Sequence, residues 1–286
     1  MKKWSIPAKT FLLGEYSALA DKGAILLTTQ PCFELTLTEN PGLQGIHPDS
    51  PAGQCWRLIG NPQYGLHWHD PFNHCGGMGA SSAQFLGAYL AASDLIETTP
   101  TQANMLELYW QCAWSGQGLR PSGYDVMAQS LSGCVSINRS ENHCSVFPWP
   151  FDDLAFILIH TNNKLATHHH LQDATLSDNI DLLNSIVLSA KQAFIQSDSK
   201  ALINAVNAYH DALVSMSRVC PQTLQLIETI RKNPNVLAIK GCGAMGADVL
   251  LLLTSKKNAQ ALQADLQAKQ FTLLATTESL LIPQVD

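Results

Sequence analysis

Long hydrophobic runs are missing from this sequence, since no stretch of about 18 consecutive apolar residues occurs among its 286 residues. The N-terminus, MKKWSIPAK, passes from two lysines into a short strand-like stretch without the apolar core of a signal peptide. A basic tail is missing too, and the formal net charge is −6 with both signs mixed along the chain. These absences predict a cytoplasmic protein, a monomer or homodimer, that binds neither membranes nor nucleic acid.

The cysteines form no C-x-x-C pair and no dense framework. This scatter predicts reduced thiols that pack as small apolar groups. The eight cysteines are Cys32, Cys55, Cys75, Cys112, Cys134, Cys144, Cys220 and Cys242. Histidines gather in HWHDPFNHC, residues 67–75, beside Pro71. A metal site is one interpretation of this stretch, but the polar rim of a cleft is favoured because no ordered carboxylate or cysteine pattern accompanies the H-x-H pair.

With 46% hydrophobic residues, the chain can bury a large core in one large or two modest domains. Apolar alternation and periodicity predict an α+β protein whose first third is rich in strands and whose residues beyond 177 are mainly helical. We expect strands near residues 10–14, 23–29, 32–39, 134–140, 155–161, 236–240, 247–255 and 271–277. We expect helices near residues 81–97, 102–115, 125–133, 180–194, 202–213, 222–232 and 258–269.

A Walker A loop is also missing, because no G-K-[ST] occurs in the chain. Residues 76–85, GGMGASSAQF, instead form a glycine-rich turn that leads into a helix. Such a turn exposes backbone N–H groups at the positive end of the helix dipole and can bind a phosphate. The alternative is an ordinary helix start in which Ser81 or Ser82 is the N-cap.

The second glycine segment, GCGAMG at residues 241–246, matches G-x-G-x-x-G literally. A dinucleotide-binding fingerprint requires a helix directly after the glycines, but residues 249–253 are a continuous apolar run typical of a strand. We therefore predict a turn between two strands, where the backbone approaches a ligand or another loop closely.

Together with a third segment, these stretches resemble a known family. PAKTFLLGEYSAL at residues 7–19, GGMGASSA at 76–83 and KGCGAMGAD at 240–248 resemble, in order and spacing, the three motifs of the GHMP small-molecule kinases. The resemblance covers nearly the whole chain. The G-E-Y form of the first motif, SGYDV at 122–126 and Asp248 are most similar to phosphomevalonate kinases, and HTNNKLATHHHL at 160–171 is similar to a substrate-loop pattern of the mevalonate-pathway kinases.

The resemblance implies a GHMP kinase fold of two α+β domains. These are an ATP-binding domain like ribosomal protein S5 at residues 1–155 and a ferredoxin-like domain with extra helices at residues 156–286. It also implies ATP and Mg²⁺ as cofactors, Asp125 and Lys9 as catalytic residues, and Ser81 as a magnesium ligand. The ATP-binding residues implied are Gly76, Gly77, Met78, Gly79, Ala80, Ser81 and Ser82. The residues implied to border the small-molecule acceptor are Glu15, Tyr16, Ser122, Gly123, Thr167, Gly243 and Ala244.

The function implied is transfer of the ATP γ-phosphate to phosphomevalonate. Mevalonate kinase, diphosphomevalonate decarboxylase and a catalytically silent metabolite-binding relative are the alternatives. An alcohol acceptor would need Asp125 as a base, whereas a phosphate monoester is already anionic near neutral pH. Asp125 could also be only the N-cap of the helix that follows it.

The sequence departs from the family pattern at four positions, and the departures make its loops bulkier. Ala8 and Met245 and Ala247 stand where glycines are usual, and Ala80 stands where serine is commoner. A phosphorylated acceptor needs cations, and each candidate alone would be a surface charge. The candidates are Arg120, Arg139, Lys164 and Lys240, with His168 to His170 as further donors.

Overall fold

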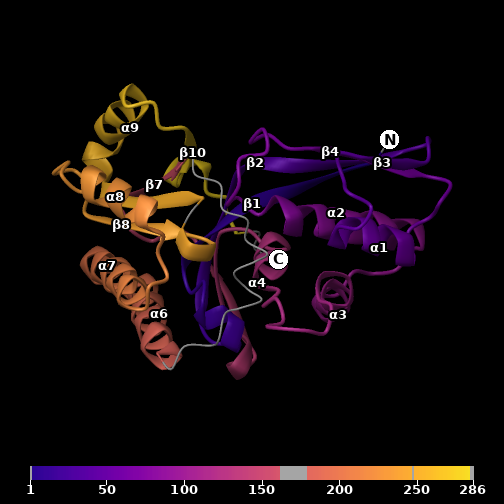
Figure 1. The fold of residues 1–286 in the computed structure, drawn as a ribbon, viewed down its shortest axis with the longest axis horizontal. Coiled ribbons are helices and arrows are strands. Elements are labelled where there is room, and N and C mark those ends of the chain that lie inside the picture. The colour runs from indigo at the N-terminus through magenta and orange to yellow at the C-terminus, as the bar shows by residue number, and fades with distance from the viewer. Residues whose placement is uncertain (1, 162–178, 247, 284–286) are drawn as a thin grey trace.

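The computed structural model describes residues 2–161, 179–246 and 248–283, which form two β-sheets and eight α-helices (Figure 1). The first sheet has the order β3-β4-β2-β5-β6, with β1 paired to β2, and the second has the order β10-β7-β9-β8. The predicted α+β class is confirmed.

The first sheet is built around two long strands, β1 (Lys3–Leu13) and β2 (Ala24–Thr38), which pair antiparallel. The sequence predicted two short strands where β2 runs without interruption. The register between β1 and β2 shifts between Ile6 and Ala8 of β1. The remaining strands of this sheet are β3 (Gly42–Gln44), β4 (Gly65–His69), β5 (Cys134–Asn138) and β6 (His143–Phe147).

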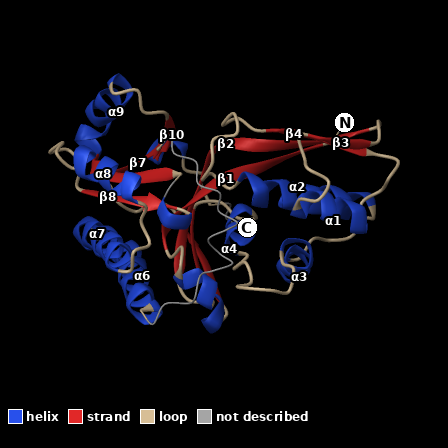
Figure 2. Ribbon diagram, in the orientation of Figure 1, coloured by secondary structure: helices blue, strands red, loops and turns tan. Residues whose placement is uncertain are grey.

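Four helices accompany this sheet, and Figure 2 shows α1, α2 and α3 gathered on one side of it. They are α1 (Pro51–Ile59), α2 (Ala80–Leu95), α3 (Gln102–Ala113) and α4 (Tyr124–Gln129). The sequence analysis did not foresee α1, although the signal was present. Ser50 accepts a hydrogen bond from the Gly53 N–H at 3.2 Å and Pro51 occupies the first helical turn, a common helix start.

The second sheet is antiparallel throughout. Its strands are β7 (Leu154–His160), β8 (Ala238–Cys242), β9 (Val249–Ser255) and β10 (Leu273–Thr276). Its helices are α6 (Ile180–Gln196), α7 (Ser199–Ser215), α8 (Pro221–Ile230) and α9 (Ala259–Ala268). The chain turns between β8 and β9 after Cys242, as predicted, but Gly241 and Cys242 belong to β8 itself. The chain passes between the sheets at residues 148–153, and the division at residue 155 stays a prediction.

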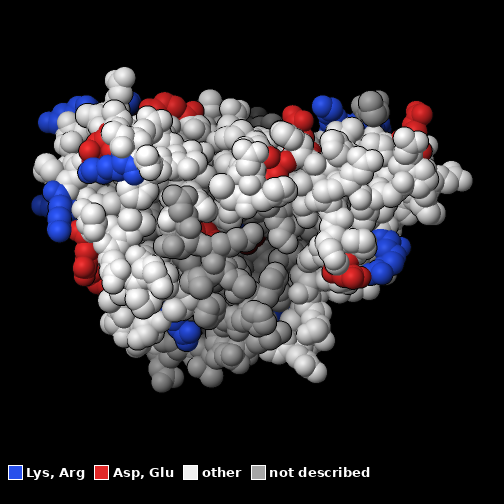
Figure 3. Space-filling model, turned by 45° about the horizontal axis from the view of Figure 1, so that its top comes forward, with Lys and Arg blue, Asp and Glu red and all other residues white. Residues whose placement is uncertain are grey.

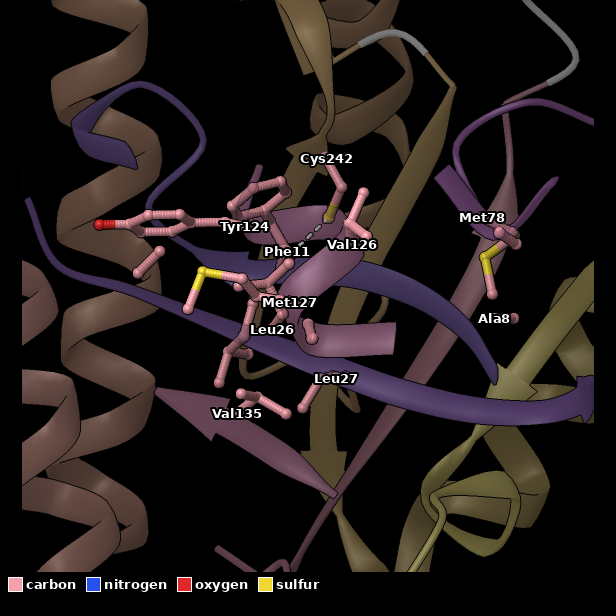
Figure 4. Packing of buried hydrophobic residues seen from close by; sticks show 14 of the residues in the cluster. Ala8, Phe11, Leu26, Leu27, Met78, Tyr124, Val126, Met127, Val135 and Cys242 are labelled. Atoms are coloured by element: carbon pink, nitrogen blue, oxygen red, sulfur yellow. Dashed lines mark hydrogen bonds between the residues drawn. The ribbon is translucent and has the colours of Figure 1, made fainter. Parts of the chain in front are cut away.

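The larger of two buried hydrophobic clusters contains residues from both halves of the chain. Phe11 of β1, Tyr124 of α4 and Cys242 of β8 belong to the same buried cluster. Figure 4 shows the thiol of Cys242 meeting the chain at Phe11, where the thiol donates to the Phe11 carbonyl at 3.3 Å. Five of the eight cysteines are buried, but Cys144 is exposed, so the prediction of core thiols is wrong there.

His210 of α7 is a buried histidine that should make stability depend on pH. Its side chain is almost inaccessible, and Nδ1 has no hydrogen-bond partner in the described part of the chain. Burial, helped by the positive charge of Arg231, lowers the pKa of His210 to about 4. The folded state therefore keeps the ring neutral while the unfolded chain binds a proton below about pH 6.5, so stability falls as the pH drops from 6.5 to 4.

We expect His210→Gln to reduce this loss. Between pH 7.5 and 5.0 the free energy of unfolding of the unaltered protein should fall by about 2 kcal/mol more than that of the variant. Urea titrations at the two pH values measure the difference. The exposed His67 supplies the control, since His67→Gln should leave the pH dependence unchanged. Parallel pH profiles for the His210 variant and the unaltered protein would contradict the prediction.

Candidate functional site

The centre of the candidate site is an ion pair between Lys9 and Asp125. Lys9 Nζ lies 2.8 Å from Asp125 Oδ1, and the side chains are 8% and 34% exposed. Asp125 is the second residue of α4, whose N-cap is Gly123 at φ 75°. Asp125 is therefore not the N-cap, and that alternative is wrong. A mostly buried ammonium beside a solvent-accessible carboxylate is an arrangement suited to charge compensation in a reaction.

The glycine turn at residues 76–79 lies directly against Lys9. The Lys9 N–H donates to the Met78 carbonyl at 3.0 Å. A Cβ on Gly79 would come within 2.8 Å of Lys9 Cε, so only glycine, here at φ 82°, allows the lysine stem to pass. The Met78 side chain is buried, and Figure 4 shows it near Ala8.

Helix α2 starts without a side-chain cap. Its N-cap is Gly79, and the Ser82 hydroxyl donates to the Gly79 carbonyl at 3.0 Å instead of accepting from a backbone N–H. The alternative in which Ser81 or Ser82 caps the helix is therefore wrong. The N-terminal N–H groups of this 16-residue helix need acceptors and carry the positive end of its dipole.

This arrangement is suited to the phosphates of a nucleoside triphosphate with Mg²⁺. The uncapped start of α2 and the Lys9 ammonium supply N–H donors and positive charge on the same side of the loop. Ser81 is exposed at the first turn, where its hydroxyl can serve as a magnesium ligand. Ala80, also in that turn, has no hydroxyl to offer.

Residues at the end of the third motif pack against the glycine turn. A Cβ on Gly76 would lie 3.1 Å from the carboxyl carbon of Asp248, and one on Gly77 would lie 2.4 Å from Val249 Cγ2. Two segments more than 160 positions apart in sequence therefore meet with no space for a side chain. Figure 3 shows acidic and basic side chains scattered over this face of the molecule, without a large patch of either sign among the described residues.

Glu15 and Lys240 form a buried ion pair between the two halves. Glu15 follows β1, Lys240 lies in β8, and their side chains are 5% and 0% exposed. Burial raises the pKa of Glu15 against the opposing effect of Lys240. Burial alone would lower the pKa of Lys240, but the Cys242 thiol, 3.5 Å from Nζ, and the Glu15 carboxylate outweigh it and raise the pKa. The expectation of a surface charge at Lys240 is wrong.

Tyr16 joins the first motif to the turn of the third. Its hydroxyl accepts a hydrogen bond from the Met245 N–H at 3.1 Å, and burial raises its pKa. Met245, one of the departures from glycine, has φ 54°, a conformation that glycine adopts more easily. Gly243, next to Ala244 in this turn, is open, because a Cβ there would meet only Asp248 Oδ2 at 3.9 Å.

The loop before Asp125 is shaped by Ser122 and Gly123. The Ser122 hydroxyl accepts from the Tyr124 N–H at 3.3 Å, and a Cβ on Gly123 would come within 2.6 Å of Leu106 Cδ2. Both residues thus shape the start of α4. The expected acceptor residue Thr167 lies outside the described residues, as do Lys164 and His168 to His170.

Gln129 is a site residue that the sequence analysis missed. It is 2% exposed, and its Nε2 donates to the Pro7 carbonyl at 2.8 Å and to the Gly79 carbonyl at 3.1 Å. It therefore ties the first motif to the glycine turn. A single glutamine at the end of a short helix gives no signal that could have identified this role.

The structure gives the histidine-rich stretch a turn-forming contact. Within residues 2–161, 179–246 and 248–283, no group of three or more His, Cys, Asp or Glu side chains is placed to hold a metal ion. Asp70 instead accepts from the N–H groups of Phe72 at 2.8 Å and His74 at 3.2 Å and so shapes the turn. His67 and His69 are exposed on β4.

No helix in the described part is long and apolar enough to cross a membrane.

No protein-family model matches the chain, and no curated protein matches it in sequence. Solved structures do match it in fold. Streptococcus pneumoniae phosphomevalonate kinase in complex with phosphomevalonate and AMPPNP aligns with a TM-score of 0.78 at 15% identity, over 96% of this chain and 99% of that one. L. major mevalonate kinase in complex with R-mevalonate aligns with a TM-score of 0.73 at 20% identity, over 100% and 97%.

Methanococcus jannaschii mevalonate kinase also aligns, with a TM-score of 0.73 at 13% identity, over 98% of each chain. The chain therefore has the fold of the GHMP small-molecule kinases, over its full length, and the predicted fold is confirmed. At these identities the likeness establishes the fold alone.

Proposed function

We propose that this protein is an ATP-dependent kinase of the mevalonate pathway that transfers the ATP γ-phosphate to phosphomevalonate. The observation that carries the proposal is the Lys9–Asp125 ion pair beside the uncapped start of α2. The GHMP kinase fold and the three sequence motifs support it, and one solved structure with this fold holds phosphomevalonate and AMPPNP.

Phosphoryl transfer requires positioning of the reactants and compensation of charge on the transferring group. The backbone N–H groups at the start of α2 bind the phosphates of ATP, and Lys9 places positive charge beside them. Ser81 holds Mg²⁺, which supplies further neutralisation of phosphate charge when bound. Gln129 keeps Pro7 and Gly79 together, so that Lys9 and the loop hold one geometry.

The proposed acceptor assigns Asp125 a positioning role. The second pKa of a phosphate monoester is about 6, so phosphomevalonate is already an anionic nucleophile at neutral pH and needs no base. Asp125 then orients the Lys9 ammonium, 2.8 Å away, toward the phosphates.

Mevalonate kinase is the second candidate, and one observation favours it. The Asp125 side chain remains 34% exposed, so a substrate hydroxyl can reach its carboxylate and give up a proton there.

A direct assay tests the proposal. Purified protein with ATP and Mg²⁺ is offered mevalonate, 5-phosphomevalonate or 5-diphosphomevalonate in separate reactions, and ADP release is followed above the rate without acceptor. We expect turnover with 5-phosphomevalonate only. Turnover with mevalonate alone would establish the second candidate instead. CO₂ release from 5-diphosphomevalonate would indicate a decarboxylase, and a lack of turnover with all three would refute a mevalonate-pathway kinase.

A further inference from the structure

Two arginines meet at one tryptophan beside the loop that precedes Asp125. The guanidinium carbon of Arg120 lies 4.2 Å from the centre of the Trp110 ring, and that of Arg139 lies 4.5 Å from it. Asp21 contacts both arginines. We call Asp21, Trp110, Arg120 and Arg139 the arginine–tryptophan cluster. Its members come from four segments, so the sequence alone could not show that they converge.

The Trp110 ring and Arg139 are firmly held. Trp110 Nε1 donates to the Pro121 carbonyl at 2.9 Å. Arg139 NH1 donates to Asp21 Oδ1 at 2.7 Å and to the Ser122 carbonyl at 3.4 Å. An aromatic face stabilises a guanidinium without using its N–H donors. Arg120, which also lies over the Trp110 ring, makes a longer ion pair, with NH2 3.5 Å from Asp21 Oδ2.

The cluster carries more positive than negative charge. Two guanidinium groups share the single carboxylate of Asp21, and the side chains of Arg120 and Asp21 are 39% and 38% exposed. A planar guanidinium whose donors are open to solvent matches a carboxylate or phosphate in a two-point hydrogen bond. The arrangement is suited to an anion that approaches Arg120 from solvent.

The cluster is attached to the segments that lead into the site. The Arg139 N–H donates to the Tyr124 hydroxyl at 2.9 Å, and that hydroxyl donates to the Lys22 carbonyl at 2.9 Å. Tyr124 directly precedes Asp125. Arg120 is five residues before Asp125, so their Cα atoms lie within about 17 Å. The cluster therefore contacts the residues that directly precede Asp125 and is separate from the Lys9–Asp125 pair.

We infer that the arginine–tryptophan cluster binds the carboxylate at the non-reacting end of the acceptor and that Arg120 determines specificity for acidic acceptors. The inference rests on the proposed function, because mevalonate and phosphomevalonate both carry a carboxylate at the end opposite the reacting oxygen. Trp110 and Arg139 keep the cluster in place, and the Arg120 guanidinium turns from Asp21 to the carboxylate of the acceptor.

Arg120→Ala tests the inference through steady-state kinetics. We expect the KM for the acceptor to rise about 10- to 100-fold, as for loss of a hydrogen bond to a charged group. The KM for ATP and kcat should change less than about twofold, and Arg120→Lys should recover part of the acceptor affinity. Arg57→Ala, at an exposed arginine of α1, is the matched control. An acceptor KM unchanged in Arg120→Ala would overturn the inference.

A neutral analogue separates charge recognition from a structural effect. The methyl ester of the acceptor should bind the unaltered protein about 10- to 100-fold more weakly than the acid, and Arg120→Ala should lose this discrimination. Equal discrimination in both proteins would overturn the inference even if Arg120→Ala lowers the melting temperature.

Binding measured without turnover distinguishes the two proposals. Calorimetry with mevalonate and with 5-phosphomevalonate, on the unaltered protein and on Arg120→Ala, does not depend on phosphate transfer. If the unaltered protein turns over the acceptor and binds it with the same affinity as Arg120→Ala does, the Arg120 assignment is refuted and the kinase proposal stands. If the unaltered protein binds the acids, Arg120→Ala does not, and no turnover is seen, only the kinase proposal is refuted. Absence of binding of both acids would overturn the Arg120 assignment.

Discussion

Lys9→Met is expected to lower kcat for phosphate transfer about 10²- to 10³-fold, the effect typical of removing one preorganised donor from a transition state. Methionine keeps an unbranched stem in the space beside Gly79 and removes the ammonium that lies 2.8 Å from Asp125. The lost group compensates charge that develops in the reaction, so the loss should fall on kcat more than on the KM for the acceptor. Initial rates of ADP release measure it.

The same strand provides the control for Lys9. Lys3 lies at the exposed start of β1, with Nζ 3.6 Å from Glu34, and Lys3→Met should leave kcat unchanged. Melting temperatures of both variants show whether the fold is intact. A kcat within threefold of the unaltered protein in a folded Lys9→Met variant would remove Lys9 from the reaction.

Lys240→Met is expected to lower the free energy of unfolding by about 3–5 kcal/mol, because it leaves the Glu15 carboxylate buried without its counter-charge. Glu15 Oε2 already has no hydrogen-bond partner in the described part of the chain, so the carboxylate has little else to stabilise it. Urea unfolding at neutral pH measures the loss. Lys256→Met, at an exposed lysine of the same half, should change stability by less than about 0.5 kcal/mol.

A double variant identifies the cause of that loss. Glu15→Gln combined with Lys240→Met removes both charges, and a pair replaced as a whole costs far less than a pair broken on one side. We expect the double variant to regain most of the stability lost in Lys240→Met. If it is as unstable as the single variant, lost packing rather than an unpaired carboxylate destabilises the protein.

Features that depend on neighbouring residues could be predicted from the sequence. The strand after residue 246 was evident from the apolar run at 249–253, and the helix after the glycine turn from its length and composition. Helix α1 was missed even though its Ser-Pro start is a common helix start. The strand β2 was divided in two because Pro31 lies within it, where proline is ordinarily excluded from central strands.

Features that depend on distant pairs could not be predicted. Arg139 and Asp21 are 118 positions apart, and Lys240 and Glu15 are 225 positions apart. A lysine in isolation is most often a surface charge, so nothing local marks Lys240 as buried. Asp125 could be an N-cap or a lysine partner on sequence grounds alone, and the position of Gly123 at the start of α4 decided between them.

The packing of Asp248 and Val249 against the glycine turn has a consequence for the order in which the candidate site is completed during synthesis. Gly76 and Gly77 pack against Asp248 and Val249, so a nascent chain that has folded only its first half lacks the residues on one side of the turn, although Lys9 and Gln129 already contact its other end. Under the proposed function, the nucleotide site would therefore be complete only in the finished chain, although most of the groups proposed to bind the phosphates belong to its first third.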